Sequence, residues 1–140
     1  MKDDFIKLIE HEYCVLDGGF GTILQERGLT PDDLPEEWNI KRPDVIRDIH
    51  LEYFIAGAQV VTTNTFGGSP LKLGMKGKQQ LLEEVNRRAV ELAKEALGLF
   101  RCKTDIPEDE RVEKRFIAGS IGPSGKIIGM EVSKDDTRKS

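Results

Sequence analysis

The run CVLDGGFGT, residues 14–22, places a carboxylate and three glycines directly after a short apolar segment. Asp17 at a strand end can hold a cationic ligand group such as an α-ammonium, and it can equally cap the backbone amides of a turn. The glycines that follow leave the backbone bare, so that a small molecule can approach it closely. We therefore interpret Asp17 and the bare backbone beside it as one wall of a small-molecule site.

Two further motifs have the same form, TTNTFGGS at 62–69 and GSIGPSG at 119–125. Asn64 can both donate and accept hydrogen bonds toward a polar substrate, whereas each threonine beside it fits an ordinary strand or turn role. In all three motifs a strand runs into a glycine-rich turn.

Hydrophobic periodicity predicts the elements that position these motifs. Strands are expected at 13–17, at 58–66 and from 116 onward, and helices at 3–12, from Pro43 to Gly57 and from Leu81 to Gly98. A brief helical turn closed by Gly28 follows the first strand, while 29–43, 67–78 and 101–115 are expected to be loops. This alternation predicts parallel strands joined by right-handed crossovers, whose carboxyl ends open onto one face.

Composition excludes several classes of function. The chain has 140 residues, 38% of them hydrophobic and 33% charged, as expected for one globular domain. A net charge of -4, with basic and acidic residues interleaved, argues against a nucleic-acid partner. The longest uncharged stretch, 53–71, holds an asparagine, a proline and several glycines, so no membrane span is expected. Two distant cysteines and a charged start without a signal peptide indicate a reduced, cytoplasmic protein.

Other common site patterns fit poorly. Leu24 stands where a dinucleotide-binding GxGxxG motif needs its third glycine, and no GK[ST] of a P-loop occurs. Cys14 and Cys102 have no CxxC partner or nearby histidine, so a zinc site made from this chain alone is not expected. His11 and His50 are expected to be structural or solvated rather than catalytic.

Together, three ordered stretches resemble the homocysteine S-methyltransferase family: VLDGGFGT at 15–22, LPEEWNI at 34–40 with the run 42–69 behind it, and AGSIGPSG at 118–125. The likeness covers about residues 12–127 and is closest to the homocysteine-binding barrel of the family's cobalamin-dependent members. It implies an α/β fold, the N-terminal portion of a (β/α)8 TIM-type barrel with about three βα units and parallel strands. Residues 1–127 would form this partial barrel, and 128–140 a charged, frayed tail.

The resemblance also implies a function and a site. The family transfers a methyl group to the homocysteine thiol, which zinc activates, and forms methionine. By analogy, the chain supplies the amino-acid-binding half of the site: Asp17, Gly18 and Gly19 hold the amino-acid end of homocysteine, and Asn64, Thr65 and Gly122 complete the near wall.

The departures from the family pattern matter equally. The family's zinc ligands are cysteines on later strands, and no such signature occurs here, so the chain alone is expected to be inactive. An open sheet edge is expected to require the remaining half of the barrel or self-association, and a corrinoid or folate domain with cobalamin is a further expected partner. Two alternatives stay open: a non-enzymatic truncated or split barrel module that needs a complementary chain, and a different enzyme on a parallel α/β scaffold.

Overall fold

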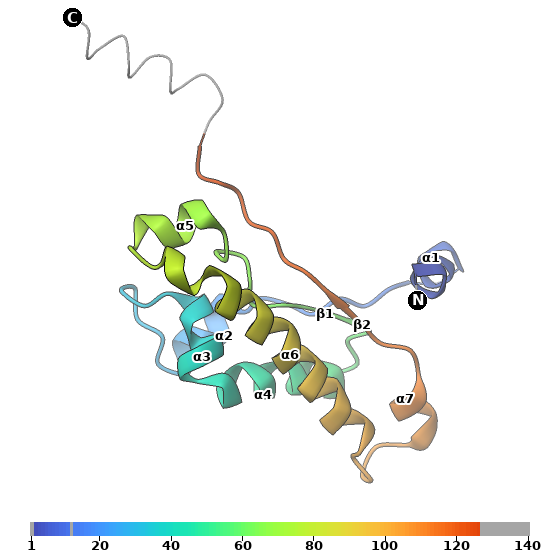
Figure 1. Ribbon diagram of the computed structural model, residues 1–140. Helices are drawn as coiled ribbons and strands as arrows, with labels where there is room; N and C mark the ends of the chain where they lie inside the picture. Colours follow the sequence, from blue (N-terminus) through green and yellow to red (C-terminus); the bar gives the residue numbers. More distant parts are fainter. Residues whose placement is uncertain (1, 12, 127–140) are drawn as a thin grey trace, which may run out of the picture.

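Figure 1 shows the computed structural model, which describes residues 2–11 and 13–126. The helices are α1 (Lys2–His11), α2 (Gly21–Glu26), α3 (Trp38–Lys41), α4 (Pro43–Ile55), α5 (Pro70–Met75), α6 (Leu82–Arg101) and α7 (Glu108–Val112). Two 3-10 helices, η1 (Pro35–Glu37) and η2 (Gln79–Leu81), and two strands, β1 (Val60–Thr62) and β2 (Phe116–Ala118), complete the elements. The expected tail at 128–140 lies outside the described residues.

The two strands form a parallel pair in which Val60 lies opposite Phe116 and Thr62 opposite Ala118. The predicted first strand is present only as a parallel bridge between Leu16 and Val60. Its pairing stops early for a physical reason. The backbone N–H of Thr62, which would form the next rung, donates instead to the Asp17 carboxylate at 2.8 Å.

Helices α4 and α6 lie side by side against one side of the strands (Figure 1). The apolar face of α6 recurs at helical spacing and is buried. One core cluster comprises Leu24, Trp38, Val45, Ile46, Ile49 and Leu92, and a second comprises Phe54, Ala58, Val61, Ala93, Ala96 and Phe100. Both predicted helices are therefore confirmed, although the second runs past Gly98 to Arg101.

The three stretches expected to be loops each contain a short helix. The segment 29–43 holds η1 and α3, because Pro35 suits the first turn of a helix and Trp38 packs into the core. Within 67–78, Ser69 caps α5 by accepting a hydrogen bond from the Lys72 N–H at 3.2 Å. The third, 101–115, contains α7. Gly28 has a φ of 105°, as its predicted place at a helix end requires.

The guanidinium of Arg115 joins the start of β2 to the turn between α4 and β1. It donates to the Ala58 carbonyl at 2.8 Å and lies over the Phe100 ring at 5.1 Å. The side chain is only 4% exposed. Arg115 therefore fixes where β2 begins relative to β1.

At the amino ends of the strands, α1 packs through an edge-to-face contact of Phe5 with Phe116, with 5.3 Å between ring centroids. The side of the sheet segment away from α4 and α6 is less covered, since Leu16, which pairs with Val60 and not with the inward-facing Val61, is 60% exposed. Tyr13, just before this segment, is 98% exposed. Among the described helices, none combines the length and apolar character that a membrane crossing requires.

Candidate functional site

The three glycine-rich motifs meet at one end of the molecule, because the segments that lead into them run parallel. In Figure 1 this is the end where α2, α3 and α5 gather, and α1 and α7 lie toward the other. A cavity of about 300 Å³ opens there. Its wall includes Gly18 and Phe20 after the first segment, Glu36 on η1, Thr62 and Asn64 from the end of β1, and Ser120 after β2.

Asp17 lies beside this cavity, bonded to one of its wall residues. Its backbone N–H donates to the Val60 carbonyl at 2.9 Å. Its carboxylate accepts hydrogen bonds from the Thr62 amide at 2.8 Å and the Thr62 hydroxyl at 3.1 Å. Burial raises the pKa of Asp17, and the hydrogen bonds from Thr62 oppose that rise. The half-buried carboxylate is thus held in one orientation.

Gly18 and Gly19 differ in the space that is available for a side chain. A Cβ on Gly18 would lie 3.0 Å from the Tyr53 hydroxyl oxygen, whereas one on Gly19 would meet no atom within 4 Å. The hydroxyl of Tyr53, which lies on α4, donates to the Gly19 carbonyl at 2.6 Å and so holds the loop that contains both glycines against α4. Gly18 lines the cavity, and Gly19 is exposed next to it.

Asn64 lines the cavity, but its amide N–H groups form hydrogen bonds within the protein. They donate to the Pro35 carbonyl at 2.9 Å and to Asn39 Oδ1 at 3.0 Å. The Asn39 amide in turn donates to the carbonyls of Asn64 at 3.0 Å and Val85 at 2.9 Å. This buried pair joins the end of β1 to η1, α3 and α6.

Thr65 and Gly122 stand outside the cavity lining and link its loops. The Thr65 hydroxyl donates to the Ser120 carbonyl at 2.7 Å. The Gly122 N–H donates to the Phe66 carbonyl at 3.1 Å, and a Cβ on Gly122 would lie only 2.3 Å from that oxygen. Both residues therefore hold the loop after β2 against the loop after β1.

Sequence reasoning missed Glu36, a buried acid in the cavity wall. Its carboxylate accepts a hydrogen bond from the Gly67 N–H at 2.6 Å. The available signal was Pro35 ahead of two acids and a tryptophan, which marks a helical turn rather than an extended loop. Phe20, Phe66 and Ser120 were also not singled out as wall residues.

Comparison with known proteins agrees with this arrangement. The sequence profile of the family described as homocysteine S-methyltransferase matches residues 14–140. The chain belongs to the homocysteine S-methyltransferase family. The resemblance found in the sequence motifs is thereby confirmed.

Two relatives within the known proteins are both named methionine synthase, from Mycobacterium tuberculosis and Mycobacterium leprae. Each is 33% identical over 130 residues, which cover 89% of this chain and 10% of the relative. The chain thus spans about one tenth of the length of these relatives.

Solved structures of this family superpose on the chain. The homocysteine methyltransferase MmuM from Escherichia coli in its oxidized form gives a TM-score of 0.68 at 28% identity, covering 84% of this chain and 40% of that one. Its metallated form gives 0.67 at 26% identity, covering 91% of this chain and 42% of that one. The predicted fold class is therefore confirmed as part of a TIM-type α/β barrel.

The residues described here do not fit the zinc centre expected of a homocysteine S-methyltransferase. Among them, no three histidine, cysteine or acidic side chains are grouped as a metal would require. Both cysteines are free thiols, Cys14 partly buried and Cys102 exposed. The described part of the chain therefore holds no cluster of metal ligands.

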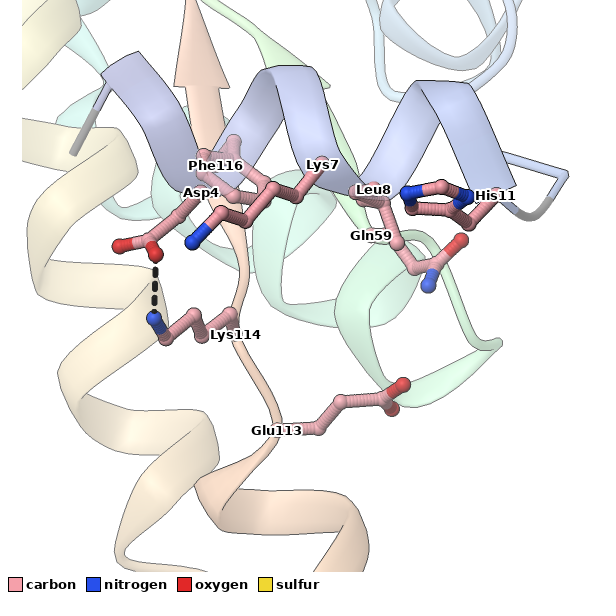
Figure 2. Close-up of a pocket in the computed structure, with 8 residues that line it drawn as sticks. All are labelled: Asp4, Lys7, Leu8, His11, Gln59, Glu113, Lys114 and Phe116. Carbon is pink, nitrogen blue, oxygen red and sulfur yellow. Dashed lines mark ion pairs between the residues drawn. The ribbon is translucent and has the colours of Figure 1, made fainter.

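A second cavity, of about 340 Å³, lies at the opposite ends of the strands, between α1 and the starts of β1 and β2 (Figure 2). Lys114 forms an ion pair with Asp4 across it at 2.8 Å, and this pairing lowers the pKa of Asp4. Ligands of parallel α/β barrels bind at the carboxyl ends of the strands. We therefore assign this second cavity to the packing of α1 and place the candidate site at the Asp17 end.

Proposed function

We propose that this chain forms the amino-acid-binding wall of a homocysteine S-methyltransferase site. The observation that carries the proposal is the convergence of the three motif loops on one cavity beside Asp17. Among the described residues that line it, none is a lysine, arginine or histidine. Such a wall favours a ligand with a cationic group, and family membership makes homocysteine the ligand of choice.

In this proposal each predicted residue has a defined role. The Asp17 carboxylate accepts from the α-ammonium group, and the backbone at Gly18 and Gly19 receives the amino-acid end of the ligand. Asn64 shapes the wall, while Thr65 and Gly122 act through the loops that they join. The fixed geometry of Asp17 supports its role, because a preorganised acceptor loses little conformational freedom on binding.

The methyl transfer itself needs groups beyond this wall. In the complete family domain, zinc would supply a homocysteine thiolate at neutral pH, and we place its ligands elsewhere in that domain. We propose cobalamin, on a corrinoid domain, as the methyl carrier, because the sequence motifs resemble the cobalamin-dependent members of the family. The part we assign to this chain is to bind and orient homocysteine, in the reduced cytoplasmic setting that its free cysteines favour.

We further propose that residues 1–127 act as one partial barrel domain and that the remaining half of the barrel covers its open sheet edge at β2. Support comes from the share of MmuM that the chain covers, 40%, and from a groove of about 570 Å³ along β2 and α6. Val90, Leu97 and Ile117 line this groove, with Lys94, Arg101 and Arg115 among its other residues. Further βα units would bury these apolar side chains.

The binding role is tested by titrating the reduced chain with homocysteine in a calorimeter. We expect Asp17→Asn to weaken binding by about tenfold or more, which is the cost of losing one charge-assisted hydrogen bond. Asp48→Asn, which removes the acid paired with Arg47 at 3.0 Å on α4, is the matched control and should bind as the wild type does. Equal affinities for the two variants would remove Asp17 from the site.

A further inference from the structure

Glu36 is the cavity residue to which neither the motifs nor the proposed function gives a role. It is only 3% exposed, yet it lines the cavity from η1. One of its oxygens accepts from the Gly67 N–H at 2.6 Å. A single backbone donor orients the carboxylate but does not neutralise its charge.

The next residue, Glu37, is also a buried acid, but its charge is balanced by lysines. Glu37 is 6% exposed and forms ion pairs with Lys41 at 2.5 Å and Lys78 at 3.2 Å. These lysines hold the pKa of Glu37 below its ordinary value. No ion pair of Glu36 occurs among the described residues. Because a buried carboxylate is costly without a counter-charge, the two neighbours differ in a way that calls for an explanation.

The cavity wall around Glu36 limits which positive group could pair with its carboxylate. Among the described residues that line the cavity, no basic side chain could form an ion pair with Glu36. The cavity itself, at about 300 Å³, is large enough for a small amino acid. A cationic ligand group can therefore reach the carboxylate only from within the cavity.

We propose that Glu36 is a specificity-determining residue whose carboxylate supplies the counter-charge for the ammonium group of an amino-acid ligand in this cavity. An ammonium group has three N–H donors, so a hydrogen bond to Glu36 leaves two donors for other acceptors. The inference rests on the proposed function for the identity of the ligand, homocysteine, but not for the ligand's charge.

Three thiols separate the parts of the ligand in a calorimetric titration of the reduced chain. Homocysteine carries both charged groups, 3-mercaptopropylamine keeps only the ammonium, and 4-mercaptobutanoate keeps only the carboxylate. Glu36→Gln retains an oxygen that can accept from the Gly67 N–H and removes the charge. We expect the variant to bind homocysteine and 3-mercaptopropylamine about tenfold more weakly and 4-mercaptobutanoate no more weakly than the wild type does.

Glu37→Gln is the matched control, because it removes the neighbouring buried acid, which is outside this cavity wall, and should leave the ranking of the three thiols unchanged. Thermal unfolding without ligand separates binding from packing. We expect Glu36→Gln to melt at or above the wild-type temperature, since an uncompensated charge is lost.

The outcomes distinguish the two proposals. If the wild type binds homocysteine and Glu36→Gln binds it equally well, the role of Glu36 is wrong and the proposed function stands. If the wild type binds 3-mercaptopropylamine but not homocysteine, and the variant loses that binding, Glu36 is supported and the proposed function fails. A variant that melts earlier and loses all three thiols alike overturns the inference in favour of a structural role. A wild type that binds neither amine overturns both.

Discussion

His50 is a titratable residue that the fold buries completely behind the cavity wall. It has 0% exposure, and neither ring nitrogen has a hydrogen-bond partner among the described residues. Its ring lies 5.1 Å from that of Phe20, which lines the cavity. Burial lowers the pKa of His50 from 6.5 to about 4. The residue therefore acts as a neutral aromatic spacer, as the expectation of a structural role indicated.

This burial predicts a pH dependence of stability. The unfolded chain takes up a proton at His50 as the pH falls through 6.5, whereas the folded chain does so only near 4. The contribution of neutral His50 to the free energy of unfolding is thus complete above the higher value, declines as the pH falls between the two values, and is fully lost below the lower one. Linkage gives a loss of about 2 kcal/mol between pH 7.5 and pH 5. His50→Leu should remove that component, as measured by urea unfolding at several pH values.

His11→Gln is the control, because it also removes one histidine, but His11 is exposed and not buried. The free energy of unfolding of that variant should depend on pH as the wild-type value does. If His50→Leu kept the wild-type slope as well, the assignment to His50 would be contradicted.

At the scale of elements, the cavity is held together by loops rather than by the short sheet. Gly122 shows this best, because a Cβ there would lie 2.3 Å from the Phe66 carbonyl oxygen. We expect Gly122→Ala to cost about 2 kcal/mol in the free energy of unfolding, the usual scale of an overpacked contact, and to weaken homocysteine binding as the two loops separate. Chemical denaturation and calorimetry measure the two effects.

Gly119→Ala is the matched control for this substitution. It lies just after β2, and its Cβ would meet no atom within 4 Å. A change within about 0.5 kcal/mol is expected there. A similar cost at both positions would point to general sensitivity of the segment after β2 and not to the contact with Phe66.

The sequence was informative where periodicity and packing agree. The apolar faces of α4 and α6 repeat at helical spacing, so both helices were predicted from their side chains alone. The short helices η1, α3, α5 and α7 were missed because each is a turn or two long and depends on caps or burial. Ser69, for example, looks like part of a loop until its hydroxyl is seen to accept from the Lys72 amide.

The strands were overestimated for a related reason. The segment 58–66 is rich in β-branched residues, but the strand ends at Thr62. Beyond it the threonines bond through their side chains, with 2.8 Å between the hydroxyl oxygens of Thr63 and Thr65. Asp17 and the glycine turns beside the cavity were apparent from the sequence. Glu36 was missed, because Pro35 signals a helical turn but the burial of Glu36 comes from tertiary packing.

For the molecule as a whole, the uneven covering of the sheet is the dominant feature. Helices α4 and α6 cover one side, and Tyr13 and Leu16 stay exposed. Parallel sheets are normally covered on both faces. The association of this chain with further barrel units should therefore bury apolar surface that it now exposes.

Mixing the chain with a second polypeptide that carries the remaining strands of the family barrel tests this expectation. We expect the thermal unfolding temperature to rise and any self-association, followed by sedimentation, to diminish. With zinc and a methyl donor, methionine should form only in the mixture. Full activity of the 140-residue chain by itself would contradict the division of roles proposed above.

Arg115 has a consequence for how the strands find their alignment. A slip of β2 by two residues would keep every side chain on its own face, so hydrophobic patterning alone cannot reject it. The slip would, however, carry a nearly buried guanidinium away from the Ala58 carbonyl and the Phe100 ring. Arg115 therefore disfavours the misaligned pairing, because the slip would remove both of these contacts from a side chain that is only 4% exposed.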